Sequence, residues 1–192
     1  MKDLLITGFE PFGGHGSNPA WEAVSRLPDR IGHYRLHKRR LPTVYGEAAD
    51  TVIRAAEESH AQVIVCVGLA SGRDAVTPER IAVNIRDARS PDNAGRLCSG
   101  ERIDPDGPAA WFSTLDVEAM AEAIRMCHIP ASVSNTAGTY VCNDVLYSIL
   151  NRFHGTQVRC GFIHVPNTPD LGTPNLPLER IVDALRAAIT VL

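Results

Sequence analysis

Short apolar runs alternate with amphipathic segments along this chain, and this alternation limits its fold more than any other feature. Residues 4–7 and 63–67 are continuous apolar runs, a pattern typical of strands buried on both faces of a sheet. Other segments, roughly 10 to 15 residues long, carry apolar residues at helical spacing. Strands that alternate with helices of this length indicate an α/β fold with a mainly parallel sheet.

The same patterns place the individual elements. Further strands are predicted at residues 34–41, 80–86, 131–134 and 158–165. The first of these has mixed polarity and is expected near a sheet edge. Helices are predicted at residues 19–27, 46–60, 116–126, 140–153 and 178–190. Residues 87–110, rich in Pro, Gly and Asp, form a long irregular connection, which in compact proteins is usually functional or mobile.

Size and composition favour one domain. The chain has 192 residues, 44% hydrophobic and 21% charged, and a domain of this length can bury about 70% of its unfolded surface. No Gly/Ser tract, charge block or internal repeat divides the chain. We therefore expect residues 1–192 to form a single domain.

Charge and cysteine usage argue against several functions. The net charge is −3, and the one basic cluster, residues 37–40, lies within a predicted strand, so nucleic-acid binding has little support. No run approaches the roughly 18 apolar residues of a membrane span, and no signal peptide is expected. Five scattered cysteines without CxxC spacing argue against a metal cluster or disulfide framework and favour a reducing cytoplasm.

Two glycine-rich loops, residues 8–16 and 68–73, follow predicted strands. The first contains Phe9 and Phe12 and lacks both the GxGxxG and GxxxxGK[ST] phosphate motifs. Its aromatic residues favour a small apolar ligand over a phosphate. In parallel α/β folds ligands bind outside the carboxyl ends of the strands, where both loops, Cys142 and His164 are expected to meet.

Cys142 begins an apolar helical run. Thr139 is predicted to be the N-cap of this helix, which puts the sulfur in the first turn, where the helix dipole favours thiolate over thiol. This position suits a nucleophile. The alternative is a buried free cysteine that only packs, as most do.

His164 is the only one of seven histidines predicted at the end of a strand between apolar residues. A cysteine nucleophile needs an imidazole to move its proton and usually a third group to orient that imidazole. Glu79 and several aspartates are candidates for this third group, and spacing alone does not choose among them.

Several sequence blocks resemble the pyroglutamyl-peptidase I family. They occur in the family's order over residues 4–166. The matching blocks are residues 6–14 (ITGFEPFGG), 18–19 (NP), 21–22 (WE), 79–84 (ERIAVN), 87–89 (DAR), 91–93 (PDN), 107–110 (GPAA), 132–134 (SVS), 136–143 (TAGTYVCN) and 161–166 (GFIHVP).

This resemblance implies a three-layer α/β/α sandwich with a mainly parallel, mixed twisted sheet. It implies a cytoplasmic cysteine omega-peptidase, commonly a homotetramer, that removes N-terminal pyroglutamyl (5-oxoproline) residues from peptides without a metal or cofactor. By motif, Cys142 is the nucleophile, His164 the general base and acid, and Glu79 the residue that orients His164.

The resemblance also implies a substrate pocket. Four residues match positions that line the pyroglutamyl pocket: Phe9, Phe12, Tyr140 and Val141. Arg89 matches an arginine close to the active centre. A lactam carries no charged amine, so a neutral, apolar pocket suits it.

Three positions depart from the family pattern. Leu69 stands where glutamine is frequent, and the glutamine amide is a candidate contact to the lactam. Ser90 replaces a common isoleucine, and Asn167-Thr168-Pro169 replaces Tyr-Leu-Pro. These changes are expected to affect affinity and selectivity more than the chemical step.

Two other functions remain possible on such a scaffold. A phosphorolytic transferase would need a basic phosphate site, which the sequence lacks. A non-catalytic or altered-specificity binding protein is also conceivable, since a fold does not guarantee an activity, but the complete Cys, His and Glu set argues against it.

Overall fold

A six-stranded sheet forms the centre of the computed structural model, which describes residues 1–192. Its strand order is β2-β3-β1-β4-β8-β5. The strands are β1 (Lys2–Phe9), β2 (Arg30–Ile31), β3 (Tyr34–Leu41), β4 (Val63–Leu69), β5 (Thr77–Pro78) and β8 (Arg159–Val165). The four long strands are parallel, and the two short edge strands are antiparallel to their neighbours.

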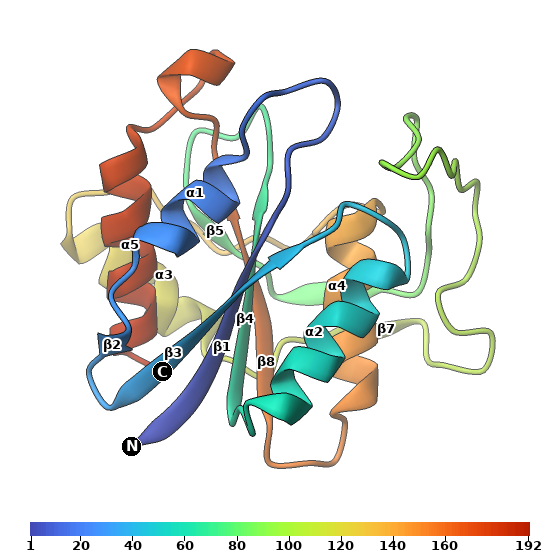
Figure 1. Ribbon diagram of the computed structural model, residues 1–192, viewed down its shortest axis with the longest axis horizontal. Helices are drawn as coiled ribbons and strands as arrows, with labels where there is room; N and C mark the ends of the chain where they lie inside the picture. Colours follow the sequence, from blue (N-terminus) through green and yellow to red (C-terminus); the bar gives the residue numbers. More distant parts are fainter.

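Helices cover both faces of this sheet (Figure 1). One layer consists of α1 (Pro19–Arg26), α3 (Val117–Met126) and α5 (Leu178–Thr190). The other consists of α2 (Glu47–Glu58) and α4 (Val141–Arg152). A short 3₁₀ helix, η1 (Pro169–Leu171), precedes α5. The predicted three-layer sandwich is confirmed.

Two hydrophobic cores lie on opposite faces of the sheet. Leu4 and Ile6 belong to the core beneath α1, α3 and α5, whereas Leu5 belongs to the core beneath α2 and α4. Successive side chains of a strand point to opposite faces, so consecutive positions in the middle of β1 must be apolar to serve both cores. This explains its continuous apolar run.

Local capping fixes where two helices begin. The Asn18 side chain accepts a hydrogen bond from the Ala20 N–H at 3.0 Å, and Pro19 occupies the first position of α1. Asp116 caps α3 by accepting a bond from the Ala119 N–H at 3.0 Å. Both starts agree with the sequence, because short polar side chains satisfy the free N–H groups of a first turn.

The predicted strand at residues 131–134 is not a regular strand. This segment runs beside residues 76–80 but makes only two isolated bridges, at Ala131 and Ser134. Pro78 lies on the facing segment and has no N–H to donate, so a continuous ladder cannot form.

The predicted strand at residues 80–86 is shorter than expected. Only β6 (Ile81–Val83) is regular, and it pairs with β7 (Ala110–Phe112) in a separate two-stranded sheet. The Ile85 N–H turns back to the Val83 carbonyl at 2.9 Å, which ends the strand. Between β6 and β7 the chain forms no helix or strand, as predicted for the long connection. No helix has the length and apolar character needed to cross a bilayer.

Candidate active site

The carboxyl ends of β1, β4 and β8 meet at one edge of the sheet, where the sequence places the site. Gly68 near the end of β4 is paired with His164 near the end of β8. Paired residues on neighbouring strands present their side chains on the same face. The His164 ring therefore lies on the face of β4 against which α4 packs.

Cys142 lies in the first turn of α4, but its helix is not capped as predicted. The N-cap is Tyr140, and no side chain caps the helix. Thr139 instead donates its hydroxyl to the Asp87 carbonyl, and its own carbonyl accepts the Asp87 N–H at 3.0 Å. Thr139 is therefore bonded to the long connection and does not cap α4. The first N–H groups of α4 keep no side-chain partner, which suits them to stabilise an oxyanion.

The Cys142 sulfur lies against the backbone of β4. A Cβ atom built on Gly68 would lie 2.8 Å from Sγ and 2.8 Å from the Phe162 ring. Glycine is therefore required for the sulfur to approach the strand that neighbours His164. Cys142 is partly buried and lines a small pocket.

His164 and Glu79 form a buried pair. Histidine Nδ1 lies 2.7 Å from Glu79 Oε1, and the side chains are 4% and 0% exposed. A carboxylate on Nδ1 holds the proton there and leaves Nε2 as the basic nitrogen. Sequence spacing could not identify the carboxylate that orients His164, whereas the structure places Glu79 against the His164 ring.

Burial dominates the protonation of both reactive groups. It raises the pKa of the Cys142 thiol to about 12, and the nearby Glu79 carboxylate adds to this. Burial also lowers the pKa of His164, against the opposing effect of Glu79. Burial therefore opposes the effect expected of the helix start and favours a thiol beside a neutral imidazole.

A small pocket opens beside Cys142. Phe9 and Leu69 are the last residues of β1 and β4, and Phe12 comes from the loop after β1. The lining residues are Phe9, Phe12, Asn18, Thr43, Leu69, Tyr140, Val141 and Cys142. None of them carries a formal charge. Five of the six predicted substrate-binding residues are therefore brought together beside the thiol.

Comparison with known proteins assigns the family. A sequence model described as pyroglutamyl peptidase matches residues 2–192. The chain belongs to the pyroglutamyl peptidase family. Pyrrolidone-carboxylate peptidases from Escherichia fergusonii and Levilactobacillus brevis are 46% and 47% identical over 196 residues, with 98% of this chain covered in each case. These alignments cover 92% and 96% of the respective relatives.

Solved structures of the family match the fold closely. Pyroglutamyl peptidase I from Bacillus amyloliquefaciens superposes with a TM-score of 0.96 at 40% identity, covering 99% of this chain and 96% of that chain. Pyrrolidone carboxyl peptidase from Thermococcus litoralis gives a TM-score of 0.94 at 40% identity, covering 100% and 93%. The resemblance drawn from sequence blocks is confirmed, and none of these matches favours a transferase or a binding protein.

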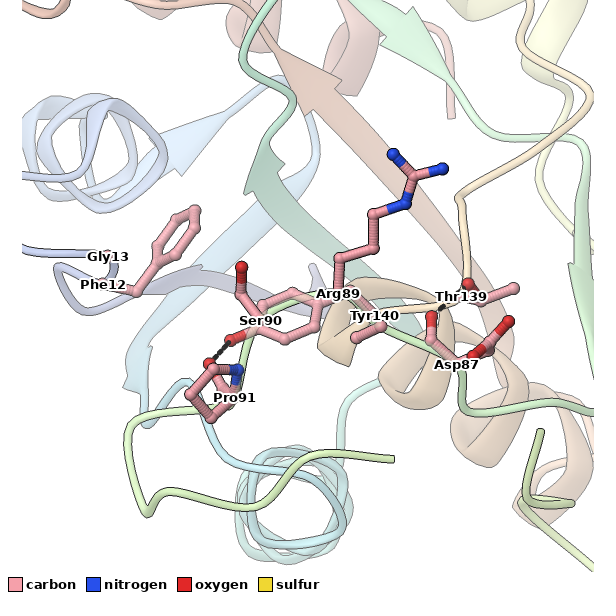
Figure 2. A pocket seen from close by; sticks show the side chains of 9 residues that line it. Phe12, Gly13, Asp87, Arg89, Ser90, Pro91, Thr139 and Tyr140 are labelled. Carbon is pink, nitrogen blue, oxygen red and sulfur yellow. Dashed lines mark hydrogen bonds between the residues drawn. The ribbon is translucent and has the colours of Figure 1, made fainter. Parts of the chain in front are cut away.

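Arg89, the sixth predicted substrate residue, does not line the pocket beside Cys142. It lines a neighbouring, more open pocket of about 350 Å³, together with Ser90. The two pockets share Phe12 and Tyr140 as walls. In Figure 2 the Arg89 guanidinium extends away from Ser90 and Pro91. Arg89 therefore lines the open pocket that adjoins the pocket beside the thiol.

The long connection, residues 87–110, is hydrogen-bonded to the loop after β1 that contains Phe12. Asn93 donates to Glu10 Oε1 at 2.8 Å and to the Pro11 carbonyl at 3.0 Å. Tyr140 donates its hydroxyl to the Pro91 carbonyl at 3.1 Å, drawn as a dashed line in Figure 2. The connection therefore forms part of the wall of the open pocket next to the one beside the thiol, which agrees with a functional role for so long a loop.

The residues that follow the cysteine fix its helix in place. Asn143 is fully buried, and its amide makes three bonds to β6 and its end: to the Val83 N–H, the Val83 carbonyl and the Ile85 carbonyl, at 2.8–3.0 Å. Asp144 is also fully buried and pairs with Arg86 at 2.7 Å.

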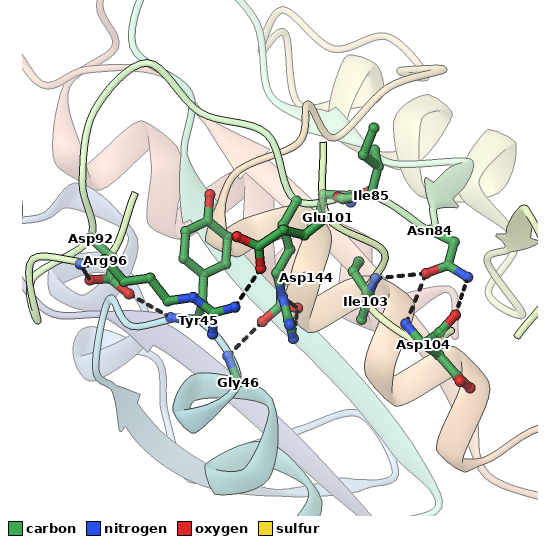
Figure 3. Close-up of polar contacts among 12 residues, drawn as sticks. Tyr45, Gly46, Asn84, Ile85, Asp92, Arg96, Glu101, Ile103, Asp104 and Asp144 are labelled. Atoms are coloured by element: carbon green, nitrogen blue, oxygen red, sulfur yellow. Dashed lines mark hydrogen bonds and ion pairs between the residues drawn. The ribbon is translucent and has the colours of Figure 1, made fainter. Parts of the chain in front are cut away.

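Asp144 also joins α4 to α2. Its Oδ2 accepts the Gly46 N–H at 2.8 Å, at the start of α2 (Figure 3). Arg86 lies 5.9 Å from the centre of the Tyr45 ring, next to Gly46. Sequence reasoning did not single out Asn143 or Asp144. Two polar residues at fully buried positions of an otherwise apolar helix face are the signal that could have identified them.

Proposed function

We propose that this chain hydrolyses N-terminal pyroglutamyl residues from peptides, with Cys142 as nucleophile, His164 as general base and acid, and Glu79 as the residue that orients His164. One observation carries the proposal. The thiol stands at the mouth of an uncharged aromatic pocket, on the sheet face that also holds the buried His164–Glu79 pair. The family of the relatives supports the same assignment.

The neutral resting pair defines the first chemical step. As Sγ attacks the pyroglutamyl carbonyl carbon, the thiol proton passes to Nε2 of His164, so the thiolate exists only as the new bond forms. Glu79 stabilises the imidazolium that results. Backbone N–H groups at the start of α4 stabilise the oxyanion.

The second half of the reaction uses the same groups in reverse. The imidazolium protonates the leaving amine as the C–N bond breaks, which leaves a thioester on Cys142. His164 then removes a proton from water, and the hydroxide adds to the thioester. Collapse returns the proton to sulfur and releases 5-oxoproline.

Selectivity in this proposal rests on shape and neutrality. Phe9 and Phe12 give apolar walls to a ring without a charged amine. Leu69 has no hydrogen-bonding side chain, and Asn18 already bonds the Ala20 N–H and the Glu10 carbonyl. The hydroxyls of Thr43 and Tyr140 donate to the Glu10 and Pro91 carbonyls. We therefore assign the hydrogen bonds to the lactam chiefly to backbone groups.

Compartment and assembly are further parts of the proposal. We place the enzyme in the cytoplasm, because all five cysteines are free thiols and one of them is the nucleophile, which suits a reducing environment. Family resemblance supports a homo-oligomer, with a tetramer as the favoured state. Light scattering of the purified protein tests the tetramer.

A paired assay tests the activity and its selectivity. Release of a fluorescent amine from a pyroglutamyl amide is measured with and without iodoacetamide, beside the corresponding alanyl amide. We expect hydrolysis of the pyroglutamyl amide only, lost after alkylation, with the modified residue mapped to Cys142. Equal hydrolysis of the alanyl amide, or activity that survives modification of Cys142, would refute the proposal.

A further inference from the structure

The Glu79 carboxylate has a second partner that the His–Glu–Cys arrangement does not explain. Arg73 lies in the glycine-rich loop after β4, and its Nη1 is 2.6 Å from Glu79 Oε1. The same nitrogen also donates to the Thr77 hydroxyl. One carboxylate oxygen therefore accepts from both the arginine and the His164 ring, while Oε2 has no partner.

Arg73 also reaches the segment that leads to the nucleophile. Its Nη2 donates to the Thr136 carbonyl at 2.9 Å. Thr136 precedes Cys142 by six residues, and its hydroxyl accepts the Gly138 N–H at 3.1 Å. A single guanidinium thus joins the acid of the site to the loop before the reactive cysteine, using the planar fork that distinguishes arginine from lysine.

We infer that Arg73 is a positioning residue of the active site, which compensates the charge of the Glu79 carboxylate and aims it at His164 while it fixes the loop before Cys142. This inference rests on the proposed function, since it assigns His164 and Glu79 their roles. Arg73 acts through Glu79 and does not line the pocket beside the thiol.

The charge of Arg73 matters because Glu79 is fully buried. A buried carboxylate is stabilised by a cation and destabilised by its loss. Three groups face Glu79: Arg73 from the loop after β4, His164 from β8 and Cys142 from α4. Only Arg73 carries a permanent positive charge, so it compensates the carboxylate when the ring is neutral.

Removal of this cation has a predictable sign. Without Arg73, the Glu79–His164 pair binds a proton more readily, whether the proton is on the ring or on the carboxyl group. On the ring the proton occupies Nε2, which is then no longer a free base; on the carboxyl group it removes the negative charge that stabilises the imidazolium. The arginine charge accordingly contributes to the low pKa of His164. Loss of Arg73 must move the acidic limb of the activity profile to higher pH.

Arg73→Gln and Arg73→Lys separate charge from hydrogen bonding. We expect kcat/KM of Arg73→Gln on a pyroglutamyl amide to fall about 100-fold at neutral pH, part of the 10²–10⁴-fold that general base catalysis contributes. The apparent pKa of its acidic limb should rise by about one unit, which is the lower end of the shift that a neighbouring charge causes. KM should change little, and Arg73→Lys should keep the wild-type limb.

Arg80→Gln is the matched control. Arg80 lies one residue after Glu79, but its side chain bonds Glu118 and Asn135 at the surface. This variant should keep the wild-type pH profile. An Arg73→Gln profile with an unmoved acidic limb, even with uniformly lower activity, would overturn the inference.

Two further measurements keep the test decisive. Should Arg73→Gln fail to fold, Arg73→Ala is assayed with and without guanidinium at a non-denaturing concentration; recovery of activity supports the inference, and absence of recovery refutes it. Cys142→Ser and Glu79→Gln are assayed alongside. If both are inactive and Arg73→Gln has the wild-type profile, only this inference fails, whereas an active Cys142→Ser enzyme contradicts the proposed function itself.

Discussion

Cys142 experiences two opposing electrostatic influences. The start of α4 presents positive partial charge to the sulfur, and Arg73 acts in the same direction. Burial and the Glu79 carboxylate act against them and raise the thiol pKa to about 12. Because desolvation is the largest influence, we expect the residue to rest as a thiol whose proton passes to His164 during the attack.

This balance predicts an uncharged resting site. The ultraviolet absorbance of the thiolate, measured as the difference between wild type and Cys142→Ser, should be absent at neutral pH. It should grow only in alkaline solution, because a raised thiol pKa shifts ionisation upward. A thiolate signal already present at neutral pH would show a resting thiolate–imidazolium pair instead.

At the level of elements, α4 is fixed by polar residues that follow the nucleophile. Asn143 pairs its amide with both backbone groups of Val83, as a neighbouring strand would. Asp144 bonds the start of α2 and pairs with Arg86. The position of the thiol therefore depends on the contacts that Asn143 and Asp144 make with other parts of the fold.

Asn143→Ala should destabilise the protein strongly. The substitution leaves the Val83 N–H and the Ile85 carbonyl without partners, while the Val83 carbonyl keeps only the Ile85 N–H. Unsatisfied buried groups cost about 1–3 kcal/mol each. We expect the free energy of unfolding to fall by roughly 2–4 kcal/mol in urea titrations. Ser148→Ala, on the same helix and not fully buried, serves as control and should stay within about 0.5 kcal/mol of wild type. Equal effects of the two substitutions would contradict this account.

Hydrophobic patterns predicted the long elements well, because each long strand or helix must match a continuous burial pattern. The runs at residues 4–7 and 63–67 lie within β1 and β4, which serve both cores. The two- and three-residue strands β2, β5 and β7 escaped prediction, since so few residues form no period and their pairing depends on distant partners.

The site was predictable only in part for a similar reason. Cys142 and His164 follow from their places at a helix start and a strand end. Glu79 needed the family resemblance, because its approach to His164 spans 85 residues of chain. Thr139 was assigned as a cap from local sequence, whereas a partner 52 residues away, Asp87, takes its hydroxyl. No local sequence pattern pointed to Arg73.

For the whole molecule, we propose that the two cores fold as one domain. They share every long strand of the sheet, so one layer cannot lose its packing without exposing the other side of the same strands. The two tryptophans offer a direct test, since Trp21 packs against the core beneath α1 and Trp111 against the core beneath α4.

Single-tryptophan variants should unfold together. Trp111→Phe leaves Trp21 as the reporter of the first core, and Trp21→Phe leaves Trp111 for the second. In each variant, the urea transition followed by fluorescence should coincide with the one followed by circular dichroism, as a cooperative domain requires. A fluorescence transition that separates from the circular dichroism transition would show two independently unfolding layers.

The most direct test of the catalytic account compares two cysteine substitutions in one assay. Cys142→Ser removes the nucleophile that stands at the pocket, and Cys127→Ser removes an exposed thiol at the end of α3. Initial rates on a pyroglutamyl amide are measured for both variants at equal concentrations of folded protein. We predict that Cys142→Ser loses at least roughly 10³-fold in kcat, as expected when a nucleophile is removed, while Cys127→Ser matches wild type. A Cys142→Ser enzyme that retains wild-type turnover would contradict the account.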